Sequence, residues 1–274
     1  MYRQNLHTHT VYCDGRDTPE ELVKEALCLG FDSIGFSGHS YMRWNPTVYL
    51  NPEREPLYKE DVLALKEKYK DLIDIYLGIE VEMRSMPLDL SDYDYTIGSV
   101  HFVKKGDQFL MMDRSADYVR GLINEHFGGD GMAYAKCFYE TTALLGQYGK
   151  FDIVGHFDLV TKHAESVTFF DTESKEYQNA ALEALHAVGE THDIFELNTG
   201  AIGRGYRKTP YMAPFLMREL RSMNKKLIIS SDCHDKARLA VYFPEAVEYI
   251  KSFGFSELYT LTKNGFQPVR IEKV

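Results

Sequence analysis

The segment that decides the fold reads Lys226-Leu227-Ile228-Ile229-Ser230-Ser231-Asp232-Cys233-His234. Its short apolar run predicts a buried strand, and the polar residues that follow lie where that strand ends. Asp232 and His234 supply a carboxylate and an imidazole, which bind divalent zinc, iron or manganese well. An apolar run followed by side chains of this kind is the pattern to look for elsewhere in the chain.

Similar apolar runs recur along the sequence. They cover residues 3–6, a run that ends at Ile34 and Phe36, and residues 74–79, 95–100, 151–154, 193–197 and 226–229. These are seven predicted strands, and residues 257–261 are a possible eighth.

Helical patterns lie between most of these strands. The clearest begins at residues 18–21, where Thr18 can cap the helix, Pro19 suits its first turn and Glu21 completes a capping box. Gly30 is a natural stop for it. The other helical patterns cover residues 59–69, 116–126, 132–148, 174–188, 212–223 and 244–253. Strands that alternate with helices predict a parallel α/β fold, and seven or eight such units match the size of a β/α barrel.

Composition narrows the possible partners. The chain has 274 residues and a formal net charge of −10, which disfavours nucleic acid because such a surface repels phosphate backbones. No apolar stretch approaches the roughly 20 residues of a membrane span, and residues 1–7 lack the apolar core of a signal peptide. The four cysteines have no CxxC spacing, which favours reduced thiols in a cytoplasm: Cys13, Cys28, Cys137 and Cys233.

Possible metal ligands follow six of the predicted strands. The carboxyl ends of the strands of a barrel converge on one face, where active sites form. Six of the ten histidines fall at these ends, and the spacing of His7 and His9 puts both rings on one side of a strand. The full set is His7, His9, His39, Glu80, His101, His156, Asp232 and His234.

Each of these residues also has an ordinary interpretation. His39 could be a core or loop residue, Glu80 a surface residue of its strand, and Asp232 the cap of the next helix. These interpretations would have to hold independently at every position, so the conjunction favours a metal site. Glu82 shares a strand face with Glu80, and we expect it behind the ligands or at the surface. Four histidines are expected to be ordinary polar residues, His163 possibly at the rim: His126, His163, His186 and His192.

These residues lie in motifs that resemble those of the PHP (polymerase and histidinol phosphatase) superfamily. The motifs are His7-Thr8-His9, Ser37-Gly38-His39, Gly78-Ile79-Glu80-Val81-Glu82, Ile97-Gly98-Ser99-Val100-His101, Gly155-His156-Phe157-Asp158 and Ser231-Asp232-Cys233-His234. They cover essentially the whole chain in the family's order. The length and residues 196–202 resemble the stand-alone histidinol-phosphate phosphatases. The resemblance implies one domain over residues 1–274, a distorted (β/α)7 barrel with a metal site at the carboxyl ends of its strands.

The resemblance also implies three divalent transition-metal ions, zinc, manganese or iron. It assigns His7, His9, Glu80 and Asp232 to the first ion, Glu80, His101 and His156 to the second, and Asp14, His39 and His234 to the third. Asp14 could instead be only the first residue of an Asp14-Gly15 turn. Cys233 stands where relatives often carry alanine, and we expect it to serve packing, because nearby anionic groups disfavour a thiolate.

The family usually holds phosphate with cations from the loops after the fifth and sixth strands. Those loops contain Lys162, Arg204 and Arg207 here. Arg204 is our first choice, because a guanidinium can hold two phosphate oxygens at once. Arg207 could equally belong to a solvated basic turn. Arg43 and Trp44 could shape the pocket for the alcohol part of a substrate, or simply anchor their loop.

The implied activity is that of a phosphomonoesterase, hydrolysing L-histidinol phosphate in histidine biosynthesis. A hydroxide that bridges two ions at Glu80 would attack phosphorus in line, with Asp232 and His234 completing the catalytic group. The leaving alkoxide would be stabilised by the third ion, or protonated by a metal-bound water, His234 or Asp158. The alternatives are a PHP phosphoesterase acting on another small phosphate ester or nucleotide, an amidohydrolase-like enzyme, and a non-enzymatic metal-binding module. The sequence leaves the oligomeric state open.

Overall fold

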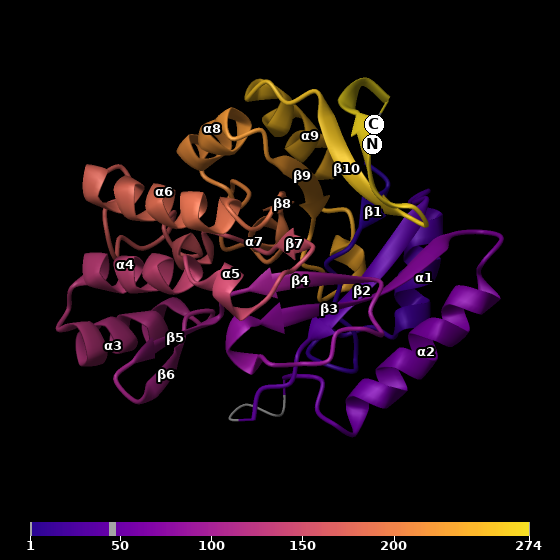
Figure 1. The fold of residues 1–274 in the computed structure, drawn as a ribbon, viewed down its shortest axis with the longest axis horizontal. Helices are drawn as coiled ribbons and strands as arrows, with labels where there is room; N and C mark the ends of the chain where they lie inside the picture. Colours follow the sequence, from indigo (N-terminus) through magenta and orange to yellow (C-terminus); the bar gives the residue numbers. More distant parts are fainter. Residues whose placement is uncertain (1, 44–47, 274) are drawn as a thin grey trace.

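A computed structural model describes residues 2–43 and 48–273, and its centre is a sheet of seven parallel strands (Figure 1). In spatial order the strands are β1 (Gln4–Asn5), β2 (Ser33–His39), β3 (Asp74–Glu82), β4 (Tyr95–Ser99), β7 (Ile153–Val154), β8 (Ile194–Asn198) and β9 (Lys226–Ser230). Just beyond β1 and β9, Thr8 pairs with Cys233 in the parallel sense. The sheet therefore curls into a nearly closed seven-stranded barrel, which confirms the predicted fold class.

Helices surround the barrel, and the longer ones pack on its outer face (Figure 1). They are α1 (Pro19–Cys28), α2 (Arg54–Lys68), α3 (Ala116–Phe127), α4 (Gly131–Thr142), α5 (Leu145–Tyr148), α6 (Lys175–Gly189), α7 (Gly200–Gly203), α8 (Pro214–Ser222) and α9 (Phe243–Ser252). The predicted capping box at the start of α1 is present, with Thr18 and Glu21 bonding each other's backbone N–H groups. Across residues 2–43 and 48–273, no helix combines the length and apolar character needed to cross a membrane.

Three helix boundaries differ from the prediction. α2 begins at Arg54, ahead of residues 59–69, because the Asn51 side chain accepts the N–H groups of Glu53 and Arg54 at the helix start. The helix predicted over residues 132–148 is split into α4 and α5. Near the break, the Thr142 hydroxyl donates to the carbonyl of Phe138, a side-chain bond of the kind that bends helices. α8 starts at Pro214 rather than residue 212, since proline suits the first helical turn.

Two hairpins lie outside the barrel sheet. The possible eighth strand is present as β10 (Glu257–Thr262), but it pairs antiparallel with β11 (Gly265–Arg270) and does not enter the barrel. The Gln4 side chain bonds both the N–H and the carbonyl of Leu261, so this hairpin packs against the amino end of the barrel. The second hairpin, β5 (Phe102–Lys105) and β6 (Gln108–Met111), follows β4 and was not predicted.

The interior of the barrel has an apolar half and a polar half. Along β3 alternate residues share a face, so Tyr76, Gly78 and Glu80 follow one another along the inside. Gly78 leaves room for the ring of Tyr95, which a methyl group at that position would overlap. The apolar half, toward the amino end, comprises Leu6, Tyr76, Tyr95, Ile97, Ile153, Ile194 and Ile228, and Leu261 of β10 packs against it from outside the barrel sheet. The later residues of the same strands form the polar half.

Short helical turns complete the chain. They are η1 (Met83–Ser85), η2 (Leu159–Thr161), η3 (Lys236–Arg238) and η4 (Ile271–Lys273). Three of them follow barrel strands closely in sequence, so they belong to the loops that border the polar end.

Candidate metal centre

The polar end of the barrel brings together every residue that the sequence singled out as a metal ligand. Four overlapping groups of side chains place their ligand atoms within 4.8 Å of one another. The groups are His9, Asp14, His39 and His234; His7, His156 and Asp232; His7, His9 and Glu80; and His39, Glu80 and His101. Residues separated by more than 200 positions in the sequence therefore form one continuous cluster.

Glu80 lies at the centre of this cluster and is almost fully buried. Its Oε2 lies 2.8 Å from His39 Nδ1 and 3.3 Å from His7 Nε2. Its Oε1 faces a different pair, at 2.9 Å from His156 Nε2 and 3.4 Å from His101 Nε2. The two oxygens thus point at separate sets of imidazoles, which is the arrangement a carboxylate needs to bridge two ions.

Asp232 closes the cluster on the side of β9. Its Oδ1 lies 3.3 Å from His9 Nε2 and 3.6 Å from His7 Nε2, and its Oδ2 accepts from Arg204 at 2.9 Å. The alternative role as a helix cap is wrong, because Asp235 caps the following turn through the N–H of Ala237.

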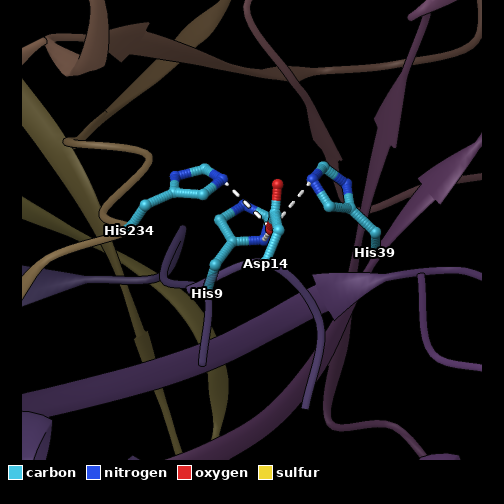
Figure 2. A group of neighbouring side chains, drawn as sticks. All are labelled: His9, Asp14, His39 and His234. Carbon is cyan, nitrogen blue, oxygen red and sulfur yellow. Dashed lines mark ion pairs between the residues drawn. The ribbon is translucent and has the colours of Figure 1, made fainter. Parts of the chain in front are cut away.

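Asp14 faces the third set of imidazoles (Figure 2). Its Oδ1 lies 3.6 Å from His9 Nδ1, 3.5 Å from His39 Nε2 and 3.2 Å from His234 Nε2. A turn is present, but it runs from Thr10 to Gly15 and Asp14 lies near its end rather than at its start, since the N–H of Gly15 bonds the carbonyl of Thr10. The turn and the ligand position are therefore compatible, because the turn is what directs Asp14 toward the histidines.

Several atoms of the cluster are buried without a hydrogen-bond partner. They include His7 Nε2 and His9 Nε2. Buried polar atoms left unpaired cost free energy and are rare in native proteins, so they point to a missing partner. Imidazole nitrogens and carboxylate oxygens are good ligands for zinc, manganese and iron. The residues present fit divalent metal ions.

Burial and charge act in opposite directions on these groups. Burial disfavours a charged His7, but neighbouring carboxylates, Glu196 first, outweigh it and raise the pKa of His7 well above its ordinary value. Burial likewise opposes ionisation of Glu80, yet the surrounding imidazoles, His7 first, hold the pKa of Glu80 well below its ordinary value. Burial, reinforced by nearby imidazoles, lowers the pKa of His9 to about 3. Glu80 is thus ionised and His9 neutral at pH 7, the forms in which they bind metals.

Two carboxylates lie behind the ligands. Glu82 accepts the N–H of His101 at 2.6 Å, and its Oε2 lies 3.3 Å from His101 Nδ1. Of its two predicted positions, the one behind the ligands is right. Glu196 accepts the N–H of His156 at 2.5 Å and lies 2.9 Å from His7 Nδ1. Both carboxylates are fully enclosed.

Glu196 was missed at the sequence level as a site residue. The pattern of ligands at strand ends indicates the positions that follow the predicted strand over residues 193–197. Glu196 lies within that strand. A signal was available, because Ile194, Glu196 and Asn198 alternate along β8 and must share one face. Ile194 lies in the apolar half of the interior, which places Glu196 on the inside as well.

Comparison with known proteins identifies the family. The PHP domain family matches residues 5–200. The chain belongs to the PHP family. A protein named "Probable histidinol-phosphatase" from Deinococcus radiodurans is 26% identical over 263 residues, covering 90% of this chain and 92% of that protein. The histidinol-phosphatase of Bacillus subtilis strain 168 is 25% identical over 260 residues, covering 85% of this chain and 94% of that protein.

A solved structure has the same fold as this PHP chain. It is the histidinol phosphate phosphatase of Lactococcus lactis, complexed with zinc, L-histidinol and phosphate. The TM-score is 0.73 at 21% sequence identity, and the match covers 97% of this chain and 98% of the other. At this identity the likeness concerns the barrel architecture.

Of the three cationic residues predicted to bind phosphate, Arg204 is the one whose side chain contacts the ligand cluster. Its NH1 lies 3.2 Å from His234 Nδ1, its NH2 donates to Asp232, and its Nε is buried without a hydrogen-bond partner. The side chain remains 21% exposed. A cavity of about 340 Å³ adjoins it, and Tyr206 and His234 also line that cavity. Arg204 can therefore meet both the cluster and a ligand from solvent.

The other predicted cations are engaged elsewhere. Arg207 is only 8% exposed and donates to Thr161 and Thr209, so the alternative of a solvated basic turn is wrong for its side chain. Lys162 forms an ion pair with Asp113, which the sequence did not suggest. Burial opposes ionisation of Asp113, but Lys162 first, with other nearby cationic groups, lowers its pKa to about 2.

Arg43 and Trp44 are the two residues expected to shape a pocket or to anchor their loop. Arg43 is exposed. Trp44 lies outside the described residues.

The histidines expected to be ordinary stand apart from the four ligand groups found among residues 2–43 and 48–273. His186 bonds Glu219 and His126 lies beside Glu125, both on surface helices. His192 accepts the N–H of Phe151 at 3.2 Å.

Three further residues near the site have structural partners. His163 bonds the Arg114 carbonyl at 2.8 Å. Cys233 is buried, and burial raises the pKa of its thiol to about 12, in keeping with packing. Asp158 is fully buried and accepts the N–H groups of Met212 and Ala213, which occupy both carboxylate oxygens.

Proposed function

We propose that this PHP chain is a metal-dependent phosphomonoesterase that hydrolyses L-histidinol phosphate to L-histidinol and phosphate. The observation that carries the proposal is the cluster of imidazoles and carboxylates at the carboxyl end of the barrel, with buried ligand atoms that lack partners. Support for the substrate comes from the relatives named histidinol-phosphatases, which match over most of their length. The structural relative that holds zinc, L-histidinol and phosphate supports it too.

Three ions would be held in the cluster, and zinc is the first choice because the structural relative contains it. The proposed ligand sets are His7, His9, Glu80 and Asp232; Glu80, His101 and His156; and Asp14, His39 and His234. When bound, such ions acidify water and neutralise charge on phosphoryl oxygens. Manganese and iron suit the same donors.

The chain's own contribution is to fix the ligands before substrate arrives. Glu80 points its two oxygens at different imidazoles, so it can serve two positions at once. Asp232 is held by the guanidinium of Arg204, which leaves Oδ1 directed at His7 and His9. A ligand set that is already oriented loses little entropy on binding, and its electrostatic effect on the transition state is correspondingly large.

Arg204 is the residue we propose to contact the phosphoryl group. It lies beside His234 and lines the adjoining cavity, and its Nε has no protein partner. Lys162 would have to leave Asp113 to take this role, and Arg207 would have to leave its two threonines. Charge-assisted hydrogen bonds from a guanidinium to phosphate are strong. They would attract the phosphoryl group locally, despite the repulsion from the net negative charge of the protein.

The leaving oxygen takes its proton from water in this proposal. Asp158 is unsuited to donate one, because both of its oxygens accept backbone N–H groups. His234 is unsuited while its Nε2 serves as a ligand, because its Nδ1 lies 2.9 Å from the carbonyl of Asp232 and donates there.

A second candidate is a PHP phosphoesterase for a small ester with more negative charge. The observation that favours it is the concentration of cations around the cavity beside His234. Arg16, Arg204 and Arg238 all line it, although Arg16 is paired with Asp235 at 3.3 Å. A substrate with a second anionic group would meet these arginines.

A substrate panel tests both candidates. The zinc-loaded protein is assayed on histidinol phosphate, sugar and nucleoside monophosphates, a bisphosphate, a phosphodiester and an amide. We expect kcat/KM to be highest for histidinol phosphate. A bisphosphate or nucleotide ranked first would favour the second candidate. Amide hydrolysis without phosphatase activity would indicate an amidohydrolase-like enzyme, and zinc binding without any turnover would contradict an enzymatic role.

A further inference from the structure

Glu196 is a fully buried carboxylate directly beneath the ligand cluster. Its Oε1 accepts the N–H of His156 at 2.5 Å and the amide of Asn198 at 2.8 Å. Its Oε2 accepts the hydroxyl of Ser230 at 2.5 Å and lies 2.9 Å from His7 Nδ1. An isolated ionised carboxylate is costly to bury. Four donors, two on each oxygen, are what an ionised carboxylate can accept, so Glu196 sits in a site built for its charged form.

The contact with His7 determines which ring nitrogen carries the proton. A neutral imidazole has one N–H, so a proton on Nδ1 that is donated to Glu196 leaves the lone pair on Nε2. That Nε2 is buried, has no hydrogen-bond partner, and lies 3.3 Å from Glu80 Oε2 and 3.6 Å from Asp232 Oδ1. When His7 is neutral, as it must be to bind a metal ion, the lone pair on Nε2 therefore faces the centre of the cluster.

We propose that Glu196 is a positioning residue that holds His7 in the Nδ1–H tautomer and so directs its Nε2 lone pair at a metal ion. The inference rests on the proposed metal-dependent function. Partners of this kind behind a metal-binding histidine fix its tautomer and raise its basicity as a ligand. Asn198 and Ser230 act one step further back, by holding the carboxylate in place.

Glu82 provides a matched comparison within the same barrel. It also lies behind a ligand, but its short bond is to the backbone N–H of His101 at 2.6 Å. Its distance to His101 Nδ1 is 3.3 Å, and that nitrogen is among the buried atoms without a hydrogen-bond partner. Glu82 thus holds the chain at His101, whereas Glu196 holds the ring of His7.

Replacing Glu196 with glutamine changes one atom and reverses the preference of His7. The backbone N–H of His156 can only donate, so the amide oxygen must stay on that side. The amide NH2 then faces Ser230 and His7. Ser230 can rotate its hydroxyl to accept, but His7 must accept at Nδ1 and carry its proton on Nε2. A protonated Nε2 cannot bind an ion.

The test measures zinc affinity and the proton position separately. Glu196→Gln is titrated with Zn²⁺ against a chelator, and we expect the affinity of one ion to fall roughly 10- to 100-fold. Ser230→Ala removes one of the two donors to Oε2 but keeps the charge of Glu196 and its contact with His7, so we expect a smaller loss of zinc affinity than for Glu196→Gln. In ¹⁵N spectra of the zinc-loaded wild type, the ring proton of His7 should lie on Nδ1.

A merely structural role would lower the thermal midpoint of the zinc-free variant and leave its zinc affinity unchanged, and that result would overturn the inference. A proton on Nε2 of His7 in the wild type would also overturn it, even if Glu196→Gln fails to fold. Glu196→Asp keeps the charge and should retain the Nδ1 proton and most of the affinity. A wild-type protein that binds no zinc would overturn the proposed function as well, which separates the two failures.

Discussion

The barrel strands contribute to both halves of the interior, but one half is a packed apolar core and the other is a cluster of possible metal ligands. Toward the amino end, the interior is filled by apolar side chains, and the Tyr95 hydroxyl finds a partner in the Leu6 carbonyl. Toward the carboxyl end, imidazoles and carboxylates crowd together and leave ligand atoms without partners. On β3 only one residue, Gly78, separates Tyr76 from Glu80 on the inner face. Stability and binding are thus divided along each strand, and substitutions in the two halves should separate them.

The largest effect is expected from Glu80→Gln in the polar half. The amide cannot serve two ions as a carboxylate does, so kcat should fall by several orders of magnitude with loss of bound metal. Glu82→Gln, on the same face and just above, should be milder, since Glu82 contacts His101 rather than the centre of the cluster. Steady-state kinetics and metal analysis of both variants check this. The reverse ranking would contradict the assignment of Glu80 as the bridging residue.

The next largest effect is expected in the apolar half. Ile228→Ala removes buried methyl groups and leaves a cavity at the apolar end of the barrel. The free energy of unfolding should therefore fall by about 2–5 kcal/mol. Metal content should stay the same, as should kcat measured well below the new melting temperature. Leu63→Ala, at a leucine that is 51% exposed, is the control and should change stability little. Urea unfolding followed by circular dichroism provides the measurement. Loss of metal from folded Ile228→Ala would show that the two halves are not separable.

Arg204→Ala should have an intermediate effect, in the polar half. Charge-assisted hydrogen bonds contribute about 1.5–3 kcal/mol, so kcat/KM for the phosphate ester should fall roughly 10- to 150-fold. Arg204→Lys should recover part of this, since an ammonium cannot make a forked contact. Metal content must be measured alongside, because Arg204 also holds Asp232. Loss of metal in parallel with activity would mean that Arg204 serves Asp232 and not the phosphate.

Arg207→Ala is the control for that experiment. Its guanidinium donates to Thr161 and Thr209, so the variant should lose stability rather than kcat/KM. If Arg207→Ala shows the large kinetic loss while Arg204→Ala is near wild type, the phosphate contact belongs to Arg207. A large loss in Lys162→Ala alone would place it on the loop after β7.

Cys233→Ala should have the smallest effect. Burial raises the pKa of this thiol to about 12, so a thiolate nucleophile is not available at pH 7. We expect kcat/KM within a few-fold of the wild type and a small loss of stability from the missing sulfur. Inactivation of Cys233→Ala with its metals still bound would contradict a packing role.

The sequence predicted which side chains meet at the polar end of the barrel, because most of them lie at strand ends, where an apolar run stops and a histidine or carboxylate follows. It predicted Glu196 poorly because that residue lies inside a strand, and only the alternation from Ile194 shows which way it points. Residues 257–261 were correctly predicted as a strand, but not the hairpin that they form with β11. A run of strand-forming residues does not indicate which sheet the strand joins. A solvated turn stayed open as an alternative for Arg207, because sequence alone does not reveal that its guanidinium donates to Thr161, far away in the chain.

Metal content measured together with activity tests the central claim most directly. The purified wild-type protein is analysed for bound elements, assayed on histidinol phosphate, then stripped with a chelator and reassayed before and after zinc is restored. We predict close to three ions per chain, loss of activity on stripping and recovery with zinc. Full activity in a protein that holds one ion or none would contradict the account.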